Sequence, residues 1–313
     1  MSTAHRGRRL DQVALGLALG WVADLALGDP RRGHPVAAFG SWAAAVETRL
    51  HRDSRAAGVL TEVVVLAPVV ALGVGAGRLP APARAMATAA LTWAALGGTS
   101  LGREGLAVHD LLATGDLPGA RARVRNLVGR VTDDLTPDEV ARAAVESVAE
   151  NSSDAVVGTL VWGAALGPLG VVLHRAANTL DAMHGHRTAR YARFGWAAAR
   201  LDDVLGWAPA RVTVLATAAA TPLRARDVVR TAVRDGRDHP SPNAGPVEAG
   251  FAAALGLRLG GRTVYSSGAE DRVVMGSGPA PVVADLPRAV ALARRVGAVT
   301  LVAAVGARLL VRR

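Results

Sequence analysis

The sequence predicts an all-α fold, a polytopic helical membrane protein, and composition and charge distribution both support this class. Half of the 313 residues are apolar and the mean hydropathy is +0.26, although aromatic residues make up only 4%. Ala, Val, Leu and Gly therefore supply the apolar character, and small residues let helices pack closely in lipid. An alanine-rich soluble helical protein would have a similar composition, so it remains the alternative at this point.

Charge-free apolar segments are the candidate membrane crossings. Residues 85–102 and 155–173 carry no formal charge, and each is roughly long enough to cross about 30 Å of hydrocarbon as a helix. Residues 63–77 are shorter, and the turn at 78–82 is expected to join them to the next segment as a hairpin. The weaker candidates are residues 12–23, 204–223 and 296–307. We therefore expect four to six crossings.

Polar stretches of very different composition separate the apolar segments, at residues 29–58, 103–154, 174–203 and 224–295. Most of them are rich in Arg, which is typical of cytoplasmic loops. Strict alternation of all the crossings would place some of them on the opposite side, so one segment is expected to be re-entrant or soluble. Gly167-Pro168 is a natural break point for it. With no internal repeat or linker, residues 1–313 are predicted to form one membrane domain whose large cytoplasmic-facing loops build one active-site cavity.

The chain lacks Lys and Cys, two residue types that many catalytic mechanisms require. All 36 basic residues are Arg, and there is no Cys. A Walker-type phosphate loop and a Schiff base both need Lys, and thiolate chemistry needs Cys, so these are excluded. The net charge is +10, but no Arg-rich run is interleaved with stacking aromatic residues, which argues against nucleic acid as a partner.

Two polar motifs lie at the ends of apolar segments. In the first, the turn Gly28-Asp29-Pro30 would hold Asp29 at the membrane surface, with His34 following. The alternative is a structural turn with a surface histidine. The second motif starts at Thr136, where a capping box predicts a helix. That helix would carry one charged stripe beside Asn151, consisting of Arg142, Glu146, Glu150 and Asp154.

The location of this stripe counts against the usual interpretation of such spacing, a solvated helix face. It runs directly into the charge-free segment at residue 155, and carboxylates at a membrane interface are costly unless they pair or bind a cation. Before any resemblance is considered, a hard-metal or Arg-paired site and a solvated face are equally good interpretations.

Two further motifs contain acids and amides. Asn178 and Asp181 are three residues apart and could share a helical face, while Asp202 and Asp203 precede an apolar segment. Adjacent acids repel each other unless a cation offsets them, although helix capping by one of them is equally compatible. The loop from Ser241 to Gly245 contains prolines that leave backbone groups unpaired, so it could bind an anion or be an ordinary surface loop.

Taken together and in this order, the four motifs resemble the adenosylcobinamide-phosphate synthase family, the cobalamin-biosynthesis membrane proteins called CobD or CbiB. The resemblance extends from about residue 20 to about residue 262. Three positions depart from the family pattern, namely Val131, Thr159 and the position after Gly245. The matching strings are Gly28-Asp29-Pro30 with His34-Pro35, Arg142 to Asn151 with Asp154, Asn178 to Met183, Arg200 to Asp203 with Pro209 and Arg211, and Ser241 to Gly245.

The resemblance implies an enzyme of the inner (cytoplasmic) membrane, multi-pass, with its active site facing the cytoplasm. It would form an amide between adenosylcobyric acid and aminopropanol phosphate, with ATP and Mg²⁺. A carboxylate is a poor electrophile, so amide formation requires its activation, most simply as an acyl phosphate, and phosphoryl transfer needs Mg²⁺ or Arg to neutralise charge. A homo-oligomer, or a complex with other corrinoid-pathway membrane enzymes, is compatible with this interpretation.

The expected site residues fall into three groups. Metal ligands would be Glu150, Asp154, Asp181 and Asp202. Catalytic residues would be Asp29, His34, Glu146, Glu150 and Asp181, with Asp29 or His34 taking the proton of the attacking ammonium. Nucleotide, phosphate or substrate carboxylate groups would be bound by Arg142, Asn151, Asn178, Arg200, Arg211, Ser241 and Asn243.

Two other functions remain open on sequence grounds. One is a non-catalytic membrane transporter or an assembly subunit of a corrinoid complex, whose interfacial acids would conduct ions or bind partners. The other is an amide ligase for a different polycarboxylate. Measured turnover would exclude a non-catalytic protein. Substrate competition would distinguish a ligase for another polycarboxylate from one for the corrinoid.

Overall fold

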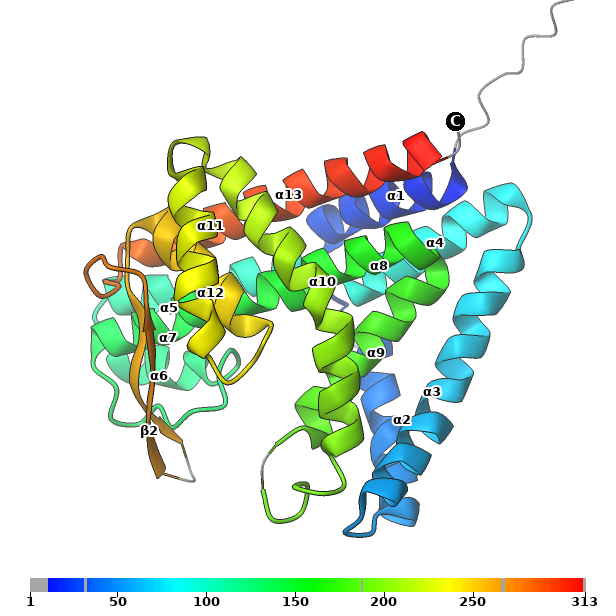
Figure 1. Cartoon of the computed structure of the whole chain (residues 1–313), viewed down its shortest axis with the longest axis horizontal. Helices are drawn as coiled ribbons and strands as arrows, with labels where there is room; N and C mark the ends of the chain where they lie inside the picture. Colours follow the sequence, from blue (N-terminus) through cyan, green and yellow to red (C-terminus); the bar gives the residue numbers. More distant parts are fainter. Residues whose placement is uncertain (1–10, 31–32, 187, 266–267, 312–313) are drawn as a thin grey trace, which may run out of the picture.

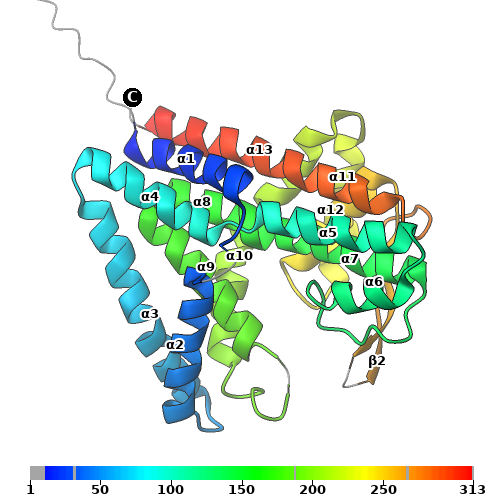
Figure 2. The ribbon, with the colours of Figure 1, turned by 180° about the vertical axis from the view of Figure 1, so that it is seen from behind.

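The structure is a computed structural model that describes residues 11–30, 33–186, 188–265 and 268–311. It is mostly helical, as the sequence predicts (Figures 1 and 2). The helices form three groups, and the candidate site lies where the second and third groups meet.

The first group consists of four apolar helices that run side by side in both views, α1 (Gln12–Leu27), α4 (Ala81–Ala95), α8 (Gly158–Leu166) and α13 (Asp285–Val311). Glycines bring two of them close together. A Cβ atom on Gly16 would lie 2.7 Å from the backbone oxygen of Ala85, and one on Gly20 would lie 2.7 Å from that of Ala89. Only small residues allow helix backbones to approach this closely.

The second group lies to one side of the first and contains α2 (Pro35–Leu50), α3 (Arg55–Arg78), α9 (Pro168–His184) and α10 (Trp196–Ala220). The break predicted at Gly167-Pro168 is confirmed, because Gly167 adopts a φ of +65° and α8 turns there into α9. Asp202 and Asp203 lie inside α10, which starts at Trp196, so the alternative that they cap this helix is wrong.

The third group forms the largest buried core. Its members are α5 (Gly98–Ala113), α6 (Leu117–Val124), α7 (Pro137–Ser152), η1 (Ser153–Val157), η2 (Pro222–Arg224), α11 (Ala225–Arg234), η3 (Gly236–Asp238) and α12 (Ala244–Leu255). The capping box at Thr136 is confirmed, since its side chain accepts from the Glu139 backbone N–H and the Glu139 carboxylate accepts from the Thr136 backbone N–H. After Ser152 the helix passes into η1, a π turn, a feature that is frequent at functional sites.

A β-hairpin stands beside this third group, and the all-α prediction is wrong at this point. Strands β1 (Leu259–Tyr265) and β2 (Gly268–Met275) pair antiparallel, with an irregular register between Leu259 and Gly261. Gly260 and Gly261 have φ values of +86° and +84°, which allow the bulge. A single hairpin whose strands contain glycines at positions 260, 261 and 268 gives little periodic signal in a sequence.

The structure agrees with some of the expected membrane segments and differs from others. Among the described residues, two helices are long and apolar enough to cross a membrane, α3 and α13, and they contain the expected segments 63–77 and 296–307. The expected span at 85–102 is wrong as a single helix, because the chain breaks at Leu96 and Gly97 between α4 and α5. The chain is therefore a helical protein with two candidate membrane-spanning helices.

Candidate functional site

Four carboxylates from three separate parts of the sequence lie close enough to act on one another. Glu150 is near the end of α7, Asp154 is in η1, Asp181 is in α9 and Asp202 is in α10. The charges of the other three acids raise the pKa of Asp154, and those of Asp181 and Glu150 raise the pKa of Asp202. The sequence placed all four in one site, and the structure brings them together because α9 and α10 pack against each other and η1 packs against both.

The proton affinity of this acid cluster is high. Burial, together with the charge of Asp181, raises the pKa of Asp202 to about 7, although the hydrogen bond between the side chains of Asn178 and Asp202 acts in the opposite direction. Burial also raises the pKa of Glu150, Asp154 and Asp181. For Asp154 the neighbouring carboxylates add to the effect of burial. A bound cation would offset this repulsion and favour the ionised forms.

Buried arginines bound the acid cluster on the side of the β-hairpin. Arg130 forms an ion pair with Glu146, and the other Glu146 oxygen accepts the backbone N–H of Gly260 at 2.8 Å. Arg272, from β2, lies 3.2 Å from Glu248 Oε1 and 3.8 Å from Glu146 Oε2. Both oxygens of Glu146 therefore accept from protein donors, and Glu146 belongs to a buried ion-pair network.

The same network contains two further buried groups from the 239–248 region. Glu248 in α12 is fully buried, and within the described residues its Oε2 has no hydrogen-bond partner. His239 Nε2 lies close to Arg272 and 3.9 Å from Glu248 Oε1. Burial first, and then the charge of Arg272, lower the pKa of His239, so a neutral imidazole that accepts from the guanidinium fits this position.

Arg175 connects the acid cluster to the first predicted motif. Its pKa is lowered mainly by burial, and it feels the charges of both Asp29 and Asp154. Asp29 Oδ1 is 3.9 Å from His34 Nε2, and His34 Nδ1 accepts the backbone N–H of Val36 to cap α2. Arg175 thus links the turn at Asp29 to the acid cluster electrostatically.

The arginines predicted to bind phosphate make other contacts. Arg142 donates to the backbone oxygens of Gly260 and Arg262, so it holds β1. Arg211 donates to Pro242 O at 3.0 Å, and Arg200 is paired with Asp203 at 3.2 Å. Arg130, Arg175 and Arg272 instead lie nearest to the acid cluster.

Among the amide and hydroxyl side chains predicted for the site, one lies in the acid cluster and the others make contacts elsewhere. Asn178 lies in the acid cluster through its hydrogen bond with Asp202. Asn151 donates to Ser147 O at 3.0 Å on its own helix. Asn243 donates to Asp203 O at 2.9 Å, and Ser241 Oγ accepts the backbone N–H of Ala244 at 3.1 Å. The loop from Ser241 to Gly245 is therefore held onto α10 beside the site, with several of its polar groups already used.

The donor set of the acid cluster suits a hard cation. Carboxylate oxygens are the ligands that Mg²⁺ prefers, and Mg²⁺ usually keeps several of its waters. Within the part of the chain that the structure describes, no three His, Asp or Glu side chains approach closely enough to ligate one ion together. Glu150, Asp154, Asp181 and Asp202 are the acids that could attract such an ion.

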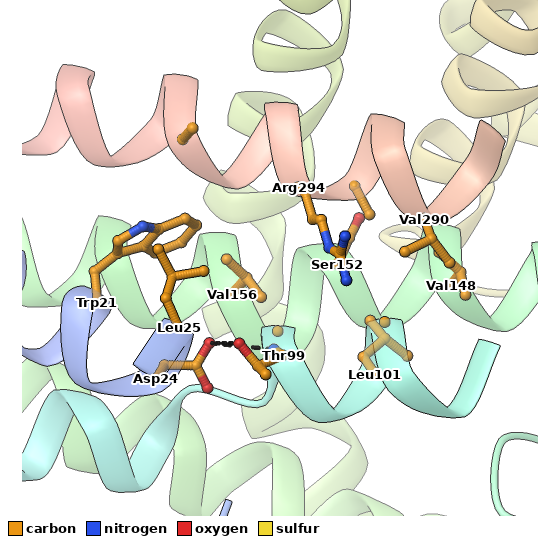
Figure 3. Close-up of a pocket in the computed structure, with 14 residues that line it drawn as sticks. Trp21, Asp24, Leu25, Thr99, Leu101, Val148, Ser152, Val156, Val290 and Arg294 are labelled. Carbon is orange, nitrogen blue, oxygen red and sulfur yellow. Dashed lines mark hydrogen bonds between the residues drawn. The ribbon is translucent and has the colours of Figure 1, made fainter. Parts of the chain in front are cut away.

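A cavity of about 260 Å³ lies between α1, α5, α7 and α13 (Figure 3). Val148, Ser152 and Val156 line it, on the helical face opposite to Glu150 and Asp154. The walls are mainly apolar, and Asp24 at one end is bound by the Thr99 backbone N–H and hydroxyl. None of the four acids is among the lining residues, so the single active-site cavity expected from the sequence is not seen at this place.

Sequence reasoning missed four members of the site, Arg130, His239, Glu248 and Arg272. One signal was available. Glu248 is the only charged residue between Asp238 and Arg258, in the otherwise apolar stretch that forms α12, and an isolated acid on an apolar helix is expected to have a partner. Arg130, His239 and Arg272 belong to the site only because the hairpin brings β2 against α7 and α12.

Glu248 gives the folded protein a pH-dependent stability. Burial raises the pKa of Glu248 to about 8 from an ordinary value of 4.5, so between these values the folded chain holds a proton that the unfolded chain has lost. Stability contributed by this group is therefore lost as the pH rises through that window. We expect the melting temperature in detergent to fall between pH 5 and pH 8, and to fall less in Glu248→Gln. An equally steep decrease in the variant would contradict the assignment.

Comparison with known proteins identifies a family that covers most of the chain. The family described as "CobD/Cbib protein" matches residues 17–293. The cobalamin biosynthesis protein CobD of Mycobacterium tuberculosis is 48% identical over 298 residues, covering 93% of this chain and 95% of the relative. That of Rhodobacter capsulatus is 43% identical over 290 residues, covering 90% and 91%. No solved structure matches the chain.

Fold and site together define a helical protein with buried carboxylates and arginines gathered between its helices. The match over most of the chain then places it within one group of such proteins: the chain belongs to the CobD/CbiB family of cobalamin biosynthesis proteins.

Proposed function

We propose that this chain is a membrane-bound, ATP-dependent ligase that joins aminopropanol phosphate to a propionate carboxylate of adenosylcobyric acid, giving adenosylcobinamide phosphate. The single observation that carries the proposal is the cluster of Glu150, Asp154, Asp181 and Asp202, bounded by buried arginines. Membership of a cobalamin biosynthesis family supports a corrinoid as the substrate.

The proposed reaction consists of a phosphoryl transfer followed by an acyl transfer. A carboxylate oxygen of the corrinoid attacks the γ-phosphorus of ATP and ADP leaves, which gives an acyl phosphate. The free amine then attacks the acyl carbon, the C–N bond forms and inorganic phosphate leaves. Mg²⁺, when bound, neutralises charge on the transferring phosphoryl group.

Residues of this chain would supply positioning and proton transfer. The acid cluster would attract the cation, and Arg175 lies near enough to Asp154 to bind an anionic group beside it. The amine arrives as an ammonium and must lose a proton before it can attack. Asp29 and His34 are the proposed acceptors, because they lie on the Arg175 side of the cluster and are only half-buried.

The proposal places the site on the cytoplasmic side of the inner membrane. Two helices, α3 and α13, are long and apolar enough to cross, and ATP is available only on the cytoplasmic side. The expectation of further crossings belongs to this proposal as well.

A product assay tests the enzyme proposal directly. Purified protein in detergent or nanodiscs is supplied with adenosylcobyric acid, aminopropanol phosphate, ATP and Mg²⁺, and corrinoids are analysed by mass spectrometry. We expect a product heavier by the amino-alcohol phosphate less one water, and its formation should require both ATP and Mg²⁺.

Reactions without ATP and with boiled protein are the controls. The competing proposal, a transporter or a non-catalytic subunit of a corrinoid complex, predicts no such product at any enzyme concentration. A different polycarboxylate that competes with the corrinoid and is itself amidated faster would instead favour another ligase.

A further inference from the structure

The exposed side of α11 carries apolar and basic residues together. Leu223, just before the helix, is fully exposed, and Val229 and Val233 are 39% and 70% exposed. Arg226 and Arg230 lie beside the valines at helical spacing, and both are exposed. We call these five residues the α11 face. The opposite side of the helix is buried through Val228, Thr231 and Ala232.

Charge on the α11 face is available to a partner. Within the described ranges, Arg226 and Arg230 form no ion pair, whereas the neighbouring Arg234 is paired with Asp235. Asp227 is the one acid that lies exposed at the edge of this face. Exposure of Leu223, Val229 and Val233 to water is unfavourable, so a partner that accepts apolar and basic side chains together would stabilise this face.

The position of α11 points to the same kind of partner. It follows α10 in the chain and is joined to it by η2 (Figures 1 and 2). Helix α10 packs against α13, which is one of the two described helices long and apolar enough to cross a membrane. Contacts between α11 and α12 fix the orientation of the exposed face, so it is presented as a rigid surface.

We propose that the α11 face docks on the anionic surface of a phospholipid bilayer. The valines and the leucine would enter the boundary between headgroups and acyl chains, and Arg226 and Arg230 would bind lipid phosphates. Nucleic acid fits this face less well, because it has no aromatic side chain on which a base could stack. The inference concerns membrane attachment and does not depend on the proposed ligase activity.

The absence of cysteine makes a direct test simple. A Val233→Cys variant is labelled with an environment-sensitive fluorophore and placed in vesicles of phosphatidylcholine, with and without phosphatidylglycerol. With phosphatidylglycerol present, we expect a blue-shifted emission and about threefold weaker quenching by aqueous acrylamide, because a docked probe leaves the water phase. High salt should reverse both changes, since it screens the arginines.

Two matched variants decide the interpretation. The same label at Ala113→Cys, an exposed position at the end of α5, should respond equally in both vesicles. Adding Arg226→Gln and Arg230→Gln to the Val233→Cys variant should abolish the effect of phosphatidylglycerol. The proposal is overturned if the Val233 label is quenched equally in both vesicles, or if its protection survives loss of both arginines. A label at Val229→Cys serves as a second reporter in the same assay.

Discussion

Replacing Glu150 with glutamine is expected to reduce corrinoid amidation by about 100-fold, the loss typical of removing one electrostatic contact to a reacting centre. Glu150 feels the charges of Arg272, Arg130 and Asp181, so it lies between the arginines and the remaining acids of the cluster. Glutamine keeps the shape of the side chain and removes the charge. The product is measured by mass spectrometry in membranes that contain equal amounts of protein.

The matched control for this variant is Asp133→Asn, which removes an acid from an exposed ion pair with Arg125 outside the acid cluster. It should leave the rate near that of the unmodified chain, since exposed ion pairs contribute little. Melting curves of both variants separate loss of chemistry from loss of folding. A Glu150→Gln protein that is folded, inserted and nearly fully active would remove Glu150 from the site.

The second large effect is expected on stability. Glu146→Ala should lower the free energy of unfolding by about 3–5 kcal/mol, because it leaves the buried guanidinium of Arg130 without its carboxylate. The side chains of Arg130 and Glu146 are only 6% and 2% exposed. The Gly260 backbone N–H would also lose its acceptor, so amide hydrogens of β1 should exchange faster. Denaturant unfolding in detergent, followed by circular dichroism, measures the change.

A double variant distinguishes an uncompensated charge from simple loss of packing. Arg130→Met combined with Glu146→Leu removes both charges and should recover most of the lost stability, since apolar pairs of similar volume replace buried ion pairs well. The surface pair of Arg123 and Glu104 is the control, and Arg123→Gln should cost at most about 1 kcal/mol. If Glu146→Ala unfolded at the same denaturant concentration as the unmodified chain, the buried pair would not hold the hairpin.

Local patterns in the sequence predicted part of the site well. The capping box at Thr136 fixed the start of α7 and hence the spacing of Glu146, Glu150 and Asp154, because side chain and backbone groups a few residues apart satisfy each other. The break at Gly167-Pro168 was predictable for the same local reason. Each of these features depends on interactions within about one helical turn.

Other features depend on contacts between distant segments, which local patterns do not show. Residues 85–102 read as one apolar span, but the chain breaks before α5, whose Thr99 backbone N–H and hydroxyl both donate to Asp24, 75 residues earlier. Arg142 was expected to bind phosphate, yet the hairpin offers it backbone oxygens at Gly260 and Arg262, more than 115 residues away. Periodicity carries no information about partners at such separations.

The sequence by itself determined the helical class, the acids available for the site, the exclusion of lysine and cysteine chemistry, and the resemblance that the family comparison confirmed. Only the tertiary structure decided which charges share a site. Packing of α9 and α10 around η1 brings Asp181 and Asp202 to Asp154, and the hairpin brings Arg272 to Glu146. The physical reason is that burial and Coulomb interactions depend on distance in space, which the order of residues along a chain does not specify.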